Sequence, residues 1–223
     1  MKLRPFAAVL AATAVAFAPW SSAAPAPQVT DVPNDANFTA TVLVGGRATP
    51  VGNQAYADVL SAQWKPFKKG KKVIGFIVTL TLAALPTPPA GTSLVYRMLG
   101  TPARCGFFGV VYYTTQNSDK TIPQSAVRDN CKDATTRLTK IPLPTISGKT
   151  LTWNVPFTVI PKDTKIGLGT KLMSLRATVH EIQDFRGVCV PDDDGLTGYG
   201  KACGLGTGLV DDALTDKTYI LGK

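Results

Sequence analysis

Aspartate side chains at two places in the sequence could bind a cation. Asp31 and Asp35 bracket the turn DVPNDAN, and Asp58 opens the stretch DVLSAQW. Calcium is bound by about six to eight oxygens from carboxylates, backbone carbonyls and water. These three carboxylates could therefore chelate it if the fold brings them together. The alternative is that Asp31 caps its own turn and Asp35 faces solvent.

Three adjacent aspartates, Asp192, Asp193 and Asp194, lie between two cysteines in the stretch CVPDDDGLTGYGKAC. An EF-hand loop spaces its acids at alternate positions, and neighbouring side chains of an extended segment point in opposite directions. The spacing therefore favours a solvated loop that a disulfide closes. A cation site that also includes Asp211 and Asp212 is the alternative.

The four cysteines of the chain form an even set, which is typical of disulfide-bonded exported proteins. We predict the sequential pairing, Cys105–Cys131 and Cys189–Cys203, because each bond then closes one local loop. Zinc binding is disfavoured, since no CxxC pair is present and His180 is the only histidine.

The sequence predicts a protein without catalytic activity. Ser-His-Asp catalysis would depend on His180, and no Gly-x-Ser-x-Gly turn is present. A hydrolase that uses His180 or a pair of aspartates is the alternative.

Aromatic side chains could form a platform for sugar rings. Trp64 and Trp153 lie in expected strands, where core packing is the default. Tyr112 and Tyr113 are neighbours in a strand, so one of them should face outward. Tyr199 lies in the glycine-rich loop between the last two cysteines. We therefore predict Tyr112, Tyr113 and Tyr199 as candidate ligand-binding residues.

Basic residues outnumber acidic ones, 24 to 15. The densest run, KPFKKGKK at 65–72, is predicted to be a hairpin tip whose lysines stay in water. Contact with an anionic cell-wall polymer is the alternative. Nucleic-acid binding is disfavoured, because only Phe67 is available for base stacking there.

The amino terminus has the order of a secretory signal peptide. Lys2 and Arg4 precede an apolar run at 6–18 and small residues at 21–26. Cleavage after Ala23 leaves a predicted single domain at 24–223 with a net charge of 22 minus 15, or +7. No later apolar stretch is long enough to cross a bilayer. We therefore expect a secreted protein, either extracellular or associated with the cell wall.

Strand patterns dominate this mature region. Apolar and polar residues alternate in 72–85 and in 171–182, where Met173, Leu175, Ala177 and Val179 share the apolar face. The other expected strands cover 58–64, 93–99, 107–115, 135–141, 149–155 and 217–221. Only a helical turn near 160–166 is expected, and proline- and glycine-rich connectors separate the strands. This pattern predicts an all-β, antiparallel sandwich stapled by disulfides.

The order of motifs resembles the DOMON-like β-sandwich modules of secreted bacterial proteins, which are similar to family-nine carbohydrate-binding modules. The resemblance rests on the opening DVPNDAN, the strand start DVLSAQW, the long strand GFIVTLTLAALP, and the close VDDALTDKTYILGK. Asn34 stands where the usual opening has glycine, and asparagine tolerates the left-handed conformation of such a turn.

The resemblance implies a jelly-roll-like fold and a non-catalytic binding or accessory role. It would also bring Asp31, Asp35 and Asp58 together at one end of the sandwich, which makes them candidate ligands of a structural calcium ion; a turn without a bound metal is the favoured alternative. We expect a module for carbohydrate or cell-envelope glycan. The alternative is a structural or protein-interaction module of the cell surface without a small ligand.

Overall fold

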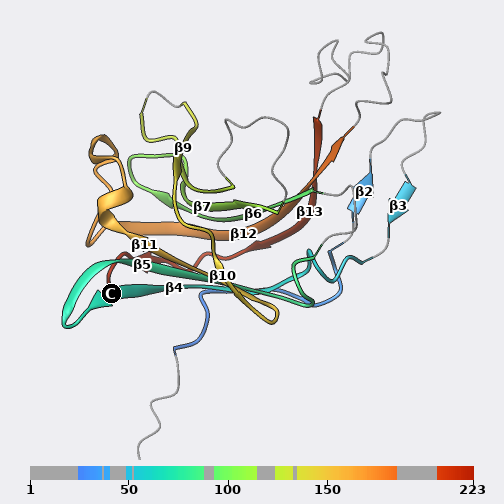
Figure 1. The fold of residues 1–223 in the computed structure, drawn as a ribbon, viewed down its shortest axis with the longest axis horizontal. Helices are drawn as coiled ribbons and strands as arrows, with labels where there is room; N and C mark the ends of the chain where they lie inside the picture. The colour runs from blue at the N-terminus through green and yellow to red at the C-terminus, as the bar shows by residue number, and fades with distance from the viewer. Residues whose placement is uncertain are drawn as a thin grey trace, which may run out of the picture.

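The computed structural model describes residues 25–36, 38–40, 49–51, 53–87, 93–114, 124–132, 135–184 and 205–223. Two antiparallel sheets account for most of these residues and lie face to face as two layers (Figure 1). The predicted fold class, an all-β antiparallel sandwich, is confirmed. None of the helical segments in these ranges is long and apolar enough to span a membrane.

The smaller sheet has five strands. Their order is β1 (Val29–Thr30), β4 (Val59–Lys69), β5 (Lys72–Leu82), β11 (Thr150–Pro156) and β10 (Thr145–Ser147). A separate hairpin pairs β2 (Phe38–Ala40) with β3 (Thr49–Val51).

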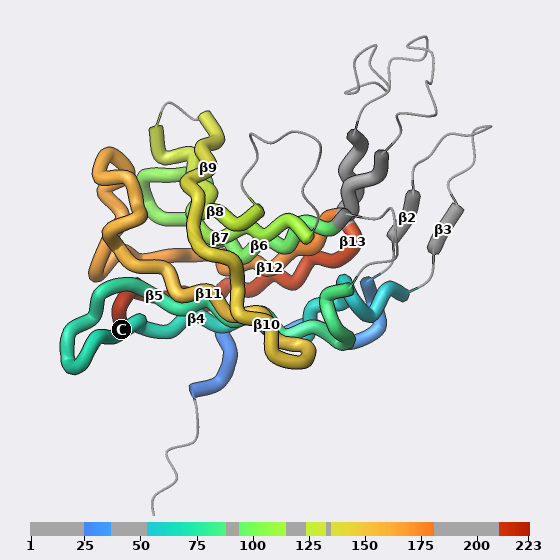
Figure 2. Tube along the Cα trace, viewed as in Figure 1, coloured from blue at the N-terminus to red at the C-terminus, as the bar shows by residue number. Residues whose placement is uncertain are grey.

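The larger sheet has seven strands. The order of six is β13 (Leu205–Leu214), β12 (Lys171–Asp184), β6 (Ser93–Pro102), β7 (Phe108–Tyr113), β8 (Ser125–Asp129) and β9 (Arg137–Lys140), and β14 (Tyr219–Ile220) also pairs with β12. The chain changes sheet between β5 and β6, between β9 and β10, and between β11 and β12, as Figure 2 shows. Two 3-10 turns, η1 (Phe157–Val159) and η2 (Lys162–Thr164), occupy the third crossing near the expected helical turn.

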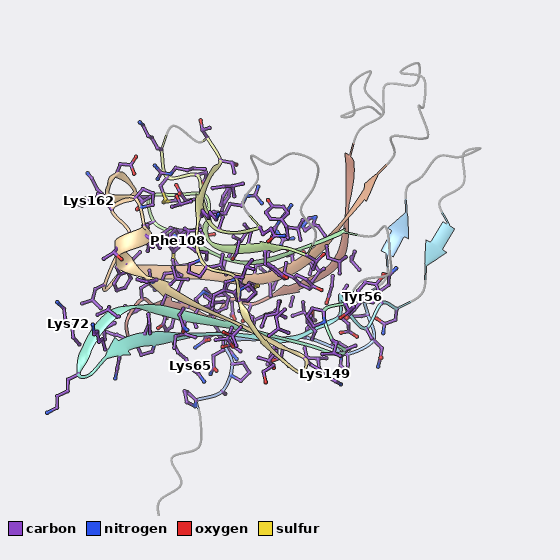
Figure 3. The ribbon with its side chains drawn as sticks, viewed as in Figure 1. Tyr56, Lys65, Lys72, Phe108, Lys149 and Lys162 are labelled. Atoms are coloured by element: carbon purple, nitrogen blue, oxygen red, sulfur yellow. A yellow bond between two sulfur atoms is a disulfide. The ribbon has the colours of Figure 1, made fainter. Side chains whose placement is uncertain are left out.

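The core lies between the two layers. The predicted alternation in β5 is confirmed, because its apolar face is fully buried: Phe76, Val78, Leu80 and Leu82. Phe108 of the other sheet meets Phe76 edge to face, with ring centroids 5.9 Å apart (Figure 3). Trp64 and Trp153 are buried as predicted.

Strand β12 contains a bulge that the alternation pattern does not reveal. Ser174 has a φ of 47°, and the register with β6 shifts between Met173 and Arg176. The bulge reverses the facing of the residues before it, so Leu172 is buried with Leu175 while Met173 is only half-buried. The prediction that Met173 shares the apolar face was therefore wrong.

The disulfide Cys105–Cys131 is present and confirms half of the predicted pairing. It joins the β6–β7 loop to the segment after β8. Cys189, Cys203 and Tyr199, together with the predicted signal peptide at 1–23, lie outside the described residues. The predictions for these residues stay predictions.

One buried hydrogen bond links the two sheets and gives a stability prediction. Trp153 Nε1 donates to Ser125 Oγ at 3.0 Å, and both residues are buried. Ser125→Ala should lower the free energy of unfolding by about 1–3 kcal/mol, because it leaves the indole N–H without an acceptor. Urea denaturation measures this, with the exposed Ser147→Ala as the control. Equal stability of the two variants would contradict it.

Candidate functional site

The turn after β1 places two of the predicted acids. Asn34 adopts the left-handed conformation expected of it, with a φ of 70°, and its backbone N–H donates to Asp58 Oδ2 at 2.6 Å. The N–H of Asp31 donates to the carbonyl of Leu60 at 3.1 Å. These bonds fix the turn, with Asp31 and Asp35, against the start of β4.

Asp211 comes to the same place from the other sheet. It lies on the inner face of edge strand β13, is only 6% exposed, and accepts hydrogen bonds from the N–H groups of Val59 at 2.5 Å and Asp212 at 2.7 Å. An acid that faces inward at a core position breaks the apolar pattern, which is typical of functional or strained sites.

Asp31, Asp35 and Asp211 form a carboxylate cluster, which we call the acid cluster. One carboxylate oxygen from each lies within 4.8 Å of the others. In Figure 2 the end of segment 25–36, in blue, and the start of segment 210–223, in red, lie at the same end of the sandwich, and the red segment then runs to the C-terminus at the other end. The structure thus brings together Asp31 and Asp35 as the resemblance implies, and adds Asp211. Asp58, the third predicted ligand, is not part of this cluster; its Oδ2 accepts the N–H of Asn34, and its role as a ligand stays a prediction.

The electrostatics of the acid cluster are unfavourable without a counter-ion. The pKa of Asp211 is raised to about 7, first by burial and then by the charges of Asp31 and Asp35. The pKa of Asp35 is raised by burial and by Asp31 and Asp58. Either a proton or a cation would reduce this repulsion.

Unpaired oxygens beside the acid cluster fit a cation better than a proton. Asp31 Oδ2 and Asp58 Oδ1 are buried and have no hydrogen-bond partner, and Asp58 is fully buried. Buried polar atoms normally have partners. Several carboxylate oxygens in a small volume suit calcium, a hard ion that prefers oxygen. The donor set therefore fits the expected ion, and Asp31, Asp35 and Asp211 would hold it.

The outer face of the seven-stranded sheet is a second candidate site. Tyr113 lies on this face, half-buried, in register with Val95 and, through it, with His180. Tyr112 faces the other way, where it stacks on Tyr96 with centroids 6.1 Å apart and meets Trp153 edge to face. Of these two predicted tyrosines, only Tyr113 is placed to meet a ligand on the outer face.

His180 is held by a guanidinium rather than by a serine. Its Nε2 lies 3.0 Å from Nη1 of Arg97, so Nε2 is the acceptor of that hydrogen bond. Burial, followed by the charges of Arg97, Arg176 and Arg128, lowers the pKa of His180 to about 4. The imidazole is therefore neutral at physiological pH.

The basic run at 65–72 forms the far end of β4 and the hairpin to β5, as predicted. Lys69 pairs with Lys72, and Gly70 has a φ of 60° in the turn. Figure 3 shows Lys72 at this hairpin and Tyr56, close in sequence to Asp58, at the opposite end of the sandwich. The lysines and the acid cluster thus occupy opposite ends.

Sequence reasoning missed three residues of these sites. From the sequence, Asp211 was grouped with the aspartates of the cysteine loop. Its position between the apolar residues Val210 and Ala213 indicates a polar side chain within a strand. Arg97 and Arg128 interrupt the apolar strands SLVYRML and SAVRD, which is a similar signal. Comparison of the chain with protein-family models, curated proteins and solved structures found no match.

Proposed function

We propose that the chain is a secreted, non-catalytic binding module for carbohydrate or cell-envelope glycan, with a structural calcium ion at one end of its sandwich. The outer face of the larger sheet carries the argument. Tyr113, Arg97 and His180 are half-buried there in neighbouring rows. An aromatic ring beside hydrogen-bond donors suits a sugar, which presents both apolar faces and hydroxyls.

The acid cluster supports the calcium part of this proposal. The ion would join the turn after β1 to edge strand β13. It would thereby tie the two sheets together at the end opposite the hairpin of 65–72. Calcium bound in this way supplies charge compensation and rigidity, and the carboxylates of Asp31, Asp35 and Asp211 position it.

The environment of His180 supports a binding role over hydrolysis. A general base needs a pKa near the working pH and a free nitrogen that faces the nucleophile. The Nε2 atom of His180 is engaged by Arg97, and its pKa is lowered to about 4.

A protein-interaction module is the second candidate, and exposed apolar side chains favour it. Leu143 and Ile146 are 57% and 46% exposed at edge strand β10, whose residues are all exposed. Exposed apolar residues at a sheet edge can receive a partner strand.

Retention on insoluble polysaccharides and purified cell walls tests the glycan proposal. The oxidised mature chain should be retained by at least one glycan in the presence of calcium, and Tyr113→Ala should reduce this retention. Tyr219→Phe is the matched control, because it removes a hydroxyl from the β14 strand while leaving the outer face unchanged. The proposal fails if the chain passes through every column unretained.

A further inference from the structure

The outer face of the seven-stranded sheet has an ordered pattern of charge. Cross-strand register places Thr178, Arg97, Val111, Ala126 and Lys140 in one row from β12 to β9. The next row contains Arg176, Leu99, Gly109, Arg128 and Leu138. Two arginines of the second row therefore lie diagonally on either side of Arg97.

Among the residues that the structure describes, this face carries more positive than negative charges. Arg97, Arg128, Arg176 and Lys140 lie on it, and Asp212 is the one described carboxylate in the same rows. Asp212 is already engaged, because its two carboxylate oxygens accept from Nε and Nη2 of Arg176. No other described acid of these rows is available to Arg97 and Arg128.

Arg97 is the centre of this positive face. It is half-buried, and its Nε is buried without a hydrogen-bond partner. Burial, then the charges of Arg128 and Arg176, lower the pKa of Arg97 to about 10. A guanidinium that has like-charged neighbours and no ion pair with a described acid lacks an anionic acceptor.

Aromatic rings lie among these cations. The guanidinium carbon of Arg128 lies 4.9 Å from the ring centroid of Phe107, a cation–π contact that holds the side chain in place. Tyr113 lies in the row next to Arg97 and is close enough to act on the pKa of Arg97, which it raises. Positive charge beside aromatic rings suits an anionic sugar better than a bare inorganic anion.

The size of the face argues for a polymer. Arg97 on β6 and Arg128 on β8 are separated by two inter-strand spacings, or about 10 Å of sheet. A chain with repeated anions can place one anion at each of these strands.

We propose that the outer face formed by β12, β6, β7 and β8 binds an acidic polysaccharide, whose sugar carboxylates pair with Arg97 and Arg128. Each guanidinium donates to a carboxylate, and Tyr113 contacts the sugar ring. This inference rests on the proposed glycan function and specifies the charge of the glycan.

Binding of hyaluronan oligosaccharides, which carry one carboxylate per disaccharide, tests this inference. Titration calorimetry of the mature oxidised chain should detect binding of hyaluronan and much weaker binding of its carboxyl-reduced, neutral form. Binding should also weaken with salt, because the Debye length falls from about 30 Å at 0.01 M to about 8 Å at 0.15 M.

Matched variants distinguish the effect of this face on binding from the effect of net charge. Arg97→Gln with Arg128→Gln should weaken hyaluronan binding by at least about tenfold. Lys71→Gln with Lys72→Gln removes the same charge from the β4–β5 hairpin and should weaken binding only slightly. Arg97→Lys keeps the charge without the planar fork and should lose part of the affinity. Thermal melting checks that each variant is folded.

Four outcomes would overturn the inference. Equal losses for the arginine and lysine pairs would mean that only net charge matters. Equal binding of polyphosphate or single-stranded DNA would mean that the sugar is not recognised. Equal binding of the neutral polymer would refute the acidic ligand while leaving glycan binding intact. Absence of any glycan binding would refute both this inference and the proposed function.

Discussion

Replacing Arg137 by methionine should lower the free energy of unfolding by about 3 kcal/mol. Asp129 is fully buried, and Arg137 donates to both of its carboxylate oxygens, with Nε and Nη2 each 3.1 Å away. Methionine keeps much of the side-chain volume but leaves a buried carboxylate whose one remaining donor among the described residues is the N–H of Cys131, at 3.1 Å. Removing one partner of a buried ion pair costs more than the pair itself contributes, because the remaining charge is uncompensated.

Two further variants show whether this buried charge is the cause. Asp163→Asn removes the exposed carboxylate that Nη1 of Arg137 also contacts, and it should change stability little, because exposed ion pairs contribute little. Adding Asp129→Asn to Arg137→Met should restore part of the lost stability, since no buried charge then remains. Chemical denaturation of the oxidised proteins measures all three. A double variant that is no more stable than Arg137→Met would contradict this explanation.

More of the fold than of the sites could be predicted from the sequence. Alternation over long strands such as β5 records directly which side chains face the core, and the hairpin turn at Gly70 follows from local composition. The disulfide Cys105–Cys131 could be predicted for a similar reason, because its partners are close in the chain. The alternation pattern gave a wrong prediction at one position. The bulge at Ser174 reverses the facing of Met173 without any change in composition.

The sites depend on register between strands that are distant in sequence. The acid cluster forms only if Asp211 lies beside Asp31, and the packing of one sheet against the other decides this. The same holds for the positive face, where Arg97, Arg128 and Arg176 come from three strands. A charged residue inside an apolar strand signals that a site exists, but its partners become known only from the register.

Removing calcium with a chelator should lower the melting temperature of the mature chain by about 5–10 °C at pH 8. A ligand present at about 100 times its dissociation constant stabilises by about 2.7 kcal/mol. For a domain of this size, each kcal/mol corresponds to about 2–4 °C. The ion would neutralise Asp31, Asp35 and Asp211, and would give a partner to the free Oδ2 of Asp31.

The pH dependence of this effect follows from the raised pKa of Asp211. In the chelated protein the pKa is about 7 in the folded state, against 3.8 for an unperturbed aspartate. The folded state therefore binds the extra proton, and the stability that this proton contributes is present below about pH 4 and is lost as the pH rises towards 7. Calcium competes with that proton, so its stabilising effect should be small at pH 5 and full at pH 8.

Single variants identify the ligands of the ion. Asp35→Asn should remove most of the calcium effect, and the chelated variant should melt no lower than the chelated parent, because one source of repulsion is lost. The exposed Asp216→Asn, five residues beyond Asp211, removes the same charge outside the acid cluster and should keep the full effect. Calorimetric scans with calcium and with chelator, at pH 5 and pH 8, give all of these quantities. If calcium and chelator give the same melting temperature at pH 8, or if the two variants respond alike, the acid cluster does not bind calcium.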